Sequence, residues 1–339
     1  MELALQQPGI SADDVSRVYQ ALLRRPPEHD PAGVKMPAVD FVLSVAVSDE
    51  RRELLEHEYF RKAAATTGMW ISKADVGYLV TYASDAWIGE AIRRTGRFGE
   101  GDIAHAARLL ERLGKPLKKA AFLDIGANIG THTLFALHDG FERALCIEAD
   151  CANFKLLRIN QILNGVDHRC VNILAAASGE DGIAELELSP VNYGDHRVRP
   201  ANPGSLPVHG EAGWSTRKVE TRRLDTLLRD CSLPPHEIGL AWIDTQGHEA
   251  HVLSGAPSLL AAGVPIVAEF WPYGLARAGN YQRLRDMLAA SGKRIYDLRQ
   301  SIAEDRPAEI GLSQLDARYD SLVQFEAIGR SPHTDLLLV

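Results

Sequence analysis

Residues 121–130 read Ala-Phe-Leu-Asp-Ile-Gly-Ala-Asn-Ile-Gly, an apolar run that ends in a glycine-containing turn. Such a run, when a helical stretch follows it, is typical of the first strand–turn–helix unit of a nucleotide-binding parallel sheet. Glu148 ends the next apolar run, where a carboxylate accepts hydrogen bonds from ribose hydroxyls. Together these features predict an α/β fold that binds a nucleoside at the carboxyl ends of its first two strands.

The residues of the turn distinguish between nucleoside ligands. Asn128 and Thr131 stand where a dinucleotide fingerprint has further glycines, which a pyrophosphate needs for close backbone approach. An acidic residue at the end of the strand, Asp124, repels phosphate and suits a ligand with an amino or sulfonium group. We therefore expect S-adenosylmethionine rather than NAD or FAD, bound by Asp124, Gly126, Asn128, Gly130, Thr131 and Glu148.

Structural roles are an alternative for several of these residues. Asp124 would serve equally as a cap for the following helix. Asn128 either binds the cofactor or stabilises its own turn, because asparagine hydrogen-bonds nearby backbone groups. Gly126 and Gly130 are expected to provide backbone geometry rather than chemistry.

Composition excludes several classes of function. The net charge is −8 and the isoelectric point is about 5.9, so a surface that tracks nucleic-acid phosphates is not expected. The four cysteines lack CxxC spacing and are interpreted as reduced thiols of a cytoplasmic protein. No apolar run reaches the 18 residues of a membrane span, and no signal peptide is seen. The oligomeric state is left open.

Three regions follow one another along the chain. Residues 1–66 have helical periodicity, residues 67–118 are interpreted as bridging helices, and residues 119–339 alternate strand and helix patterns. The alternation predicts a mostly parallel sheet with helices on both faces. Within it, residues 189–216 are rich in Pro, Gly, Asn and His and are expected to form a surface loop or lid, and residues 321–326 are assigned to one of the last strands.

Six segments resemble the FkbM-type methyltransferases: FLDIGANIGTHTL (122–134), CIEAD with NFKLLRINQILN (146–164), AAASGEDG (175–182), VETRRLDTLL (219–228), WIDTQGHEAHVLSGA (242–256) and VAEF (267–270). The resemblance implies a class I, Rossmann-like fold with a seven-stranded sheet, S-adenosylmethionine as cofactor, and O-methylation of a sugar or small molecule. The chain departs from the family at Ala149, where many relatives have proline, whereas Gln246 in place of glutamate is a known variant of the family. Residues 19–33 and 48–55 resemble a short bacterial helical domain of unknown function found beside glycan-modifying enzymes.

The candidate catalytic residues follow the fourth predicted strand. Asp244 is interpreted as a base for an acceptor hydroxyl or as an orienting group, because open α/β sheets bind ligands beyond the strand carboxyl ends. His248 and Glu249 are further candidates for the base, since an imidazole accepts a proton readily at neutral pH. The alternative for Asp244 is a helix cap. Asp244, His248 and His251 also form a loose metal set, but without a second ligand cluster we expect no metal.

Other residues are placed near the ligands. The resemblance puts Ala176 and Ser178 beside the adenine, and Asn192 and Gly194 either close the acceptor pocket or form a turn. Glu269 ends the fifth predicted strand and is a further candidate for acceptor contact. The expected function is methyl transfer to a hydroxyl. The alternatives are a non-catalytic scaffold or sensor in a glycan-assembly complex and, less favoured, a nucleotide-dependent oxidoreductase.

Overall fold

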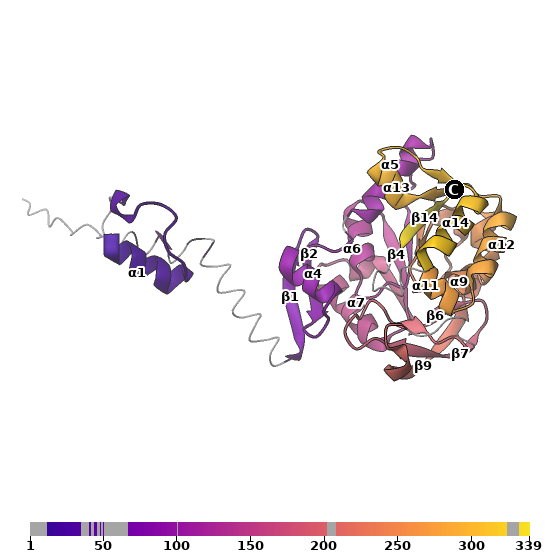
Figure 1. Cartoon of the computed structure of the whole chain (residues 1–339), viewed down its shortest axis with the longest axis horizontal. Helices are drawn as coiled ribbons and strands as arrows, with labels where there is room; N and C mark the ends of the chain where they lie inside the picture. The colour runs from indigo at the N-terminus through magenta and orange to yellow at the C-terminus, as the bar shows by residue number, and fades with distance from the viewer. Residues whose placement is uncertain are drawn as a thin grey trace, which may run out of the picture. The chain divides into compact units, whose positions relative to one another are not determined.

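A computed structural model describes residues 12–34, 41, 44, 45, 48, 50, 67–99, 101–201, 208–323 and 332–339. The chain divides into two compact units, Met1–Trp70 and Ile71–Val339, and Figure 1 draws both. No helix among these described ranges is long and apolar enough to cross a membrane. All four cysteines are free thiols, as the sequence predicted.

The smaller unit contains helix α1 (Ala12–Leu23) and the short 3-10 helix η1 (Pro31–Gly33). Apolar residues at helical spacing explain α1, because Val15 and Leu23 are buried on one side of it against Phe41 and Val45. Most of the other residues within 1–66, for which helical periodicity was also predicted, lie outside the described residues.

An eight-stranded sheet forms the centre of the larger unit, in the order β13-β12-β14-β11-β10-β3-β4-β5. The five strands β5, β4, β3, β10 and β11 are parallel neighbours, and β14 runs antiparallel to β11. The sheet thus has one strand more than the seven expected. The additional edge strand β13 has only two residues, which is too short to show a hydrophobic pattern in the sequence. The strands are β3 (Ala121–Ile125), β4 (Arg143–Glu148), β5 (Cys170–Leu174), β10 (Ile238–Ile243), β11 (Ile266–Phe270), β12 (Ile295–Asp297), β13 (Glu309–Ile310) and β14 (Thr334–Leu338).

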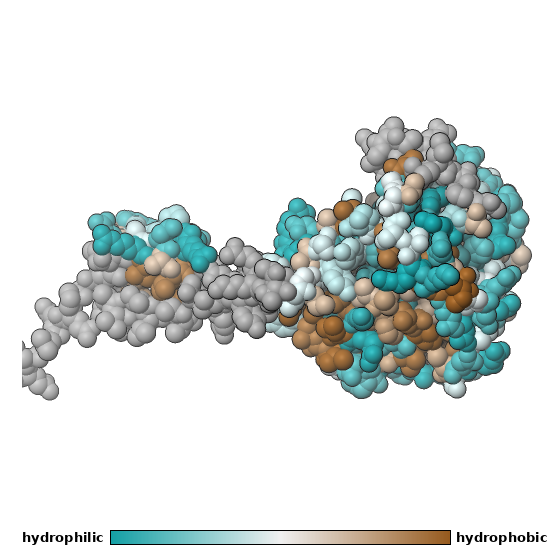
Figure 2. Space-filling view, turned by 90° about the horizontal axis from the view of Figure 1, so that it is seen from below, coloured by the Kyte–Doolittle hydropathy of each residue, from teal (hydrophilic) through white to brown (hydrophobic). Residues whose placement is uncertain are grey.

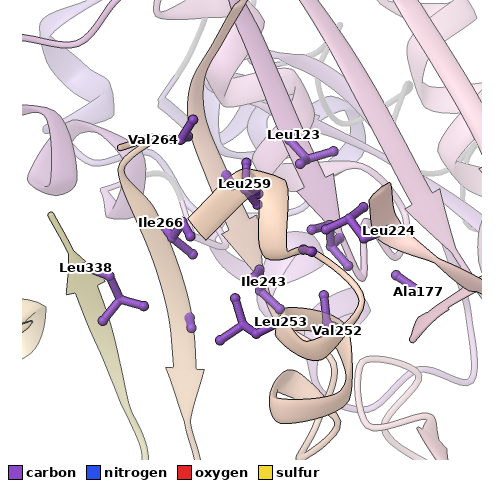
Figure 3. Packing of buried hydrophobic residues seen from close by; sticks show 14 of the residues in the cluster. Leu123, Ala177, Leu224, Ile243, Val252, Leu253, Leu259, Val264, Ile266 and Leu338 are labelled. Atoms are coloured by element: carbon purple, nitrogen blue, oxygen red, sulfur yellow. The ribbon is translucent and has the colours of Figure 1, made fainter. Parts of the chain in front are cut away.

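Helices cover both faces of this sheet (Figure 1). Side chains alternate along the central strand, so Leu123 and Ile125 join one buried cluster while Phe122 joins the other. Figure 3 shows part of the first cluster, to which the sheet contributes Leu123 and Ile243 and a covering helix contributes Leu253. The helices are α4 (Ile88–Thr95), α5 (Asp102–Arg112), α6 (Thr131–His138), α7 (Cys151–Leu163), α8 (Leu224–Asp230), α9 (Glu249–Ser254), α10 (Pro257–Ala261), α11 (Pro272–Arg277), α12 (Tyr281–Ser291), α13 (Leu298–Ala303) and α14 (Leu312–Val323), with 3-10 turns η2 (Asp167–Arg169), η3 (Glu211–Gly213) and η4 (Pro235–Glu237).

A second sheet of four strands, in the order β6-β9-β7-β8, follows β5 in the chain. Its strands are β6 (Ala176–Ser178), β7 (Gly182–Leu188), β8 (Arg197–Val198) and β9 (Ser215–Arg223). The prediction that 189–216 is a surface loop is wrong for part of its described residues, because Arg197 and Glu211 are buried. Burial is possible because Arg197 pairs with Asp195 and Glu211 and stacks between Trp214 and Trp271.

The region predicted as bridging helices also begins differently. A two-stranded sheet, β1 (Met69–Ala74) and β2 (Gly77–Tyr82), precedes α4 and α5. Asn160 of α7 explains why the hairpin packs there: its amide donates to the carbonyl of Val80 and its Oδ1 accepts the Val80 amide, as a neighbouring strand would. The strand predicted over 321–326 is also wrong where the structure describes it, because residues 312–323 are helix α14.

The surface of the larger unit is mixed, with hydrophilic residues around scattered apolar ones (Figure 2). The exposed large apolar side chains on α7 and the edge strand β5 are Ile159, Ile162, Leu163, Val171 and Leu174. Scattered exposure of this kind is ordinary in soluble proteins and defines no site by itself.

Candidate functional site

The turn between β3 and α6 has a left-handed backbone at three positions: φ is +85° at Gly126, +50° at Asn128 and +91° at Gly130. A Cβ on Gly126 would lie 1.8 Å from the backbone oxygen of Asp244, and a Cβ on Gly130 would lie 2.7 Å from Leu157 Cδ1. Glycine is therefore needed at 126 for steric reasons as well as for its φ. The close approach places the predicted cofactor turn directly against the predicted catalytic turn.

Glu148 is the last residue of β4 and binds the same turn. Its Oε2 accepts the amide of Asn128 at 2.8 Å, and its Oε1 accepts the amide of Asp150 at 2.7 Å. Burial raises the pKa of the Glu148 carboxyl to about 7, although these two amides favour the ionised form. Each carboxylate oxygen has two lone pairs, so the ionised group retains acceptor capacity for two ribose hydroxyls.

We expect the affinity for S-adenosylmethionine to rise with pH through about 7, because the ionised Glu148 is the better acceptor. Calorimetric titrations between about pH 6 and about pH 8 measure this dependence. The matched variant Glu148→Gln should bind more weakly and lose the dependence. A wild-type affinity that does not change over this range would contradict the ribose-binding role. The sign for folding is opposite: because the folded-state pKa is raised, this group's contribution to stability falls as pH rises above the ordinary value of 4.5.

Asp124 is buried in β3, and its Oδ2 accepts the hydroxyl of Thr133 at 2.5 Å. The Thr133 backbone amide, in the first turn of α6, also contributes to the environment of this carboxyl. Burial raises the Asp124 pKa, and the nearby His132 and Thr133 oppose that shift. Gly130 holds the N-cap position of α6, so Asp124 is not the residue that caps this helix, and cofactor contact remains a prediction. Thr131 is buried at the start of the same helix.

Asn128 also fixes a neighbouring loop. Its Nδ2 donates to the carbonyl of Tyr193 at 2.9 Å, and Asn153 of α7 donates to the same oxygen at 2.8 Å. The Oδ1 of Asn128 accepts the amide of Ile129, so the local turn role is present as well. Asn192 accepts the Gly194 amide, which shows the predicted turn within the loop. The loop around Tyr193 is thus fastened to the predicted cofactor turn by two amides, a connection the sequence analysis missed.

Ala176 and Ser178 lie on β6 and are buried, paired with β9. The Ser178 hydroxyl lies 3.0 Å from His248 Nε2. The structure therefore joins a predicted adenine-site residue to a predicted catalytic residue.

His248 is poorly suited to act as a base. Burial, together with the nearby His251 and Arg283, lowers the pKa of His248 to about 3. Its ring stacks on His251 with centroids 4.5 Å apart, and Arg283 Nη1 lies 2.7 Å from His251 Nδ1. A neutral imidazole with so low a pKa has little driving force to take a proton. Within the described part of the chain, no three His, Cys, Asp or Glu residues are arranged to hold a metal ion.

Asp244 follows β10, and its amide donates to the carbonyl of Ile125 in β3. Helix α9 has His248 at its N-cap position, so the alternative that Asp244 caps this helix is wrong. Gln246 Nε2 instead donates to Asp244 Oδ1 at 2.6 Å and to Glu269 Oε2 at 3.0 Å. The sequence analysis treated Gln246 as a neutral family variant, and no local pattern showed that it bridges two strands.

Glu249 is fully buried and stabilises the turn that precedes it. Its Oε1 accepts the amides of Thr245 and Gly247 and the hydroxyl of Thr245, at 2.9, 3.2 and 3.0 Å respectively. Burial raises the Glu249 pKa to about 7. These bonds give Glu249 a structural task at the Asp244 turn, and a catalytic role for it remains a prediction.

The mostly parallel sheet, with this glycine-containing turn at the end of β3, is the arrangement expected of a class I methyltransferase fold. The model of the methyltransferase FkbM domain matches residues 124–295, and the chain belongs to this family. The matched range does not include the N-terminal helical region, whose resemblance to a bacterial domain remains a prediction. A search of curated proteins finds no match for the chain.

Solved methyltransferase structures are also similar to this chain. A methyltransferase FkbM from Methylobacillus flagellatus KT shares 14% identity over 82% of this chain and 54% of its own, with a TM-score of 0.35. The chain thus spans about half the length of that protein. A precorrin-6y C5,15-methyltransferase from Geobacter metallireducens GS-15 shares 11% identity over 69% of this chain and 86% of its own, with a TM-score of 0.35. A geranyl diphosphate C-methyltransferase from Streptomyces coelicolor A3(2) shares 10% identity over 83% of this chain and 94% of its own, with a TM-score of 0.37.

Proposed function

We propose that this protein methylates a hydroxyl group of a sugar, a glycan or another small molecule, with Asp244 as the base. The observation that carries the proposal is the contact between Gly126 and the Asp244 carbonyl, where a Cβ would lie only 1.8 Å from that oxygen. This backbone contact supports a position for Asp244 beside the predicted cofactor turn. Positioned groups of this kind lower a barrier mainly by alignment.

The donor set fits the cofactor. Glu148 has acceptor capacity for ribose, and the Asp124 carboxyl in the strand before the turn disfavours a pyrophosphate. S-adenosylmethionine supplies a methyl group already activated on sulfur. The residues of the chain must orient the acceptor oxygen and remove its proton, which a well-placed base accelerates about 10²–10⁴-fold.

Calorimetry with S-adenosylmethionine tests the binding part of the proposal, with NAD as the control. We expect binding of the sulfonium cofactor alone, and preference for NAD would favour the oxidoreductase alternative. Incubation with a methyl-labelled cofactor and a panel of sugars and small alcohols then tests transfer. Tight cofactor binding without transfer to any hydroxyl would favour the non-catalytic scaffold.

A further inference from the structure

Gln246 joins two carboxyl groups that belong to neighbouring strands of the sheet. Its single amide nitrogen contacts both Asp244 Oδ1, at 2.6 Å, and Glu269 Oε2, at 3.0 Å. Gln246 has φ +55°, a left-handed conformation that glutamine rarely adopts. Such a conformation persists only where the surroundings hold it, and here the bonds to Asp244 and Glu269 and the neighbouring Gly247 turn provide that restraint.

Two adjacent carboxyl groups do not both ionise readily when they are buried. Glu269 is 8% exposed, and burial followed by the neighbouring Asp244 raises its pKa well above the usual value. Asp335 lies opposite Glu269 in the register of β14 and adds a further acidic group, whose pKa burial raises to about 7. The other charged or titratable groups that act on this set are Glu249, Asp124, His132, Asp102 and Arg299.

We propose that Gln246 and Glu269 are positioning residues that fix the Asp244 carboxyl group and direct its second oxygen at the acceptor hydroxyl. The Gln246 amide occupies Asp244 Oδ1 and leaves Oδ2 for the acceptor, while Glu269, on the same amide, holds a proton. In the transfer step the hydroxyl proton moves to Asp244, the new O–CH₃ bond forms, and the CH₃–S bond breaks with its electron pair left on sulfur. This inference rests on the proposed function.

Gln246→Glu is the first test, because it places a third acidic group between the other two. A third carboxyl group disfavours negative charge within this cluster, so the acidic limb of the kcat–pH profile should move to higher pH. We expect a shift of about one pH unit or more, hence about tenfold lower kcat on that limb. Gln314→Glu is the matched control, since Gln314 is exposed and its oxygen accepts the Gly311 amide, which glutamate also accepts. Superimposable profiles for Gln246→Glu and wild type would overturn the inference.

Glu269 provides a second test by comparison of two variants. Glu269→Ala removes the neutral partner of Asp244 and should lower kcat at least about tenfold, with little change in cofactor affinity. Glu269→Gln retains a neutral donor and should restore most of that loss. Equal kcat values for the two variants would show that Glu269 only fills space and would contradict the positioning role.

Infrared spectroscopy decides the protonation without any turnover. The wild-type protein at neutral pH should show the carbonyl stretch of a protonated carboxylic acid that disappears in Glu269→Gln. The absence of such a band would overturn the inference even in an active enzyme. A wild-type protein that methylates no hydroxyl would instead contradict the proposed function, and the infrared result would still stand as the test of the proton on Glu269.

Discussion

Asp244→Asn should lower kcat about 10²–10⁴-fold, the contribution of a positioned general base. Asparagine has nearly the same shape and its Oδ1 still accepts the Gln246 amide at the position of the 2.6 Å bond, but it takes no proton. The turn that touches Gly126 is made by the Asp244 backbone, so cofactor affinity should stay within about threefold of wild type, a change of less than 1 kcal/mol. Single-turnover kinetics with labelled cofactor, together with calorimetry, separate the two quantities.

Asp286→Asn is the matched control, because Asp286 is an exposed carboxylate on α12 that accepts a bond from Gln282. Removal of that charge should leave kcat and cofactor affinity unchanged. An unchanged kcat in Asp244→Asn would remove Asp244 from the mechanism. A loss of cofactor affinity with unchanged kcat would show instead that Asp244 binds the cofactor.

Gly126→Ala should have the largest effect on cofactor binding and on the stability of the larger unit. The new Cβ would meet the Asp244 backbone oxygen, which cannot rotate away as a side chain does, and φ at this position is +85°. The left-handed conformation costs roughly 1–2 kcal/mol and the overpacking roughly 1–3 kcal/mol more. We expect a lower thermal midpoint and at least about tenfold weaker binding of S-adenosylmethionine, or about 1.4 kcal/mol.

Two other glycines separate these contributions. Gly114 has φ +70° with nothing within 4 Å of a new Cβ, so Gly114→Ala measures the backbone cost alone. Gly130→Ala adds a contact with the Leu157 side chain, which is able to move. The thermal midpoint should fall least for Gly114→Ala, more for Gly130→Ala and most for Gly126→Ala. Equal losses at 114 and 126 would show that the contact with Asp244 has no energetic importance.

Much of the fold could be predicted from the sequence, because the patterns that indicate its helices and strands are local. Strands and helices alternate from β3 to α7 and β5, as the pattern of residues 119–339 predicts. Each combines a clear hydrophobic period with a turn signal at one end or both. The two-residue strands β8 and β13 and the helix over 312–323 were missed or wrongly assigned, because a short or weakly periodic segment takes its structure from its neighbours.

The candidate site could be predicted from the sequence only in part. The turn at 126–130 and Glu148 are contiguous with strong strand patterns, and the structure brings them together through the bond from Asn128 to Glu148. Arg197 illustrates the opposite case: it stands in a stretch with the composition of a surface loop, yet it is buried between two tryptophans. The composition of such a stretch indicates that burying its charged residues is costly, but it does not show which partners offset that cost.

By itself, the sequence determined the class of fold, the order of its main elements and the residues of the predicted cofactor turn. The hydrophobic period, the glycines and the strand-end carboxylate that support these conclusions lie within a few residues of one another. The conclusions therefore do not depend on contacts between distant parts of the chain. Only the tertiary structure decided that Gln246 bridges Asp244 and Glu269 and that His248 meets Ser178. Glu269 and Ser178 are far from Gln246 and His248 in the chain, and the order and register of the strands bring their polar atoms within hydrogen-bond distance.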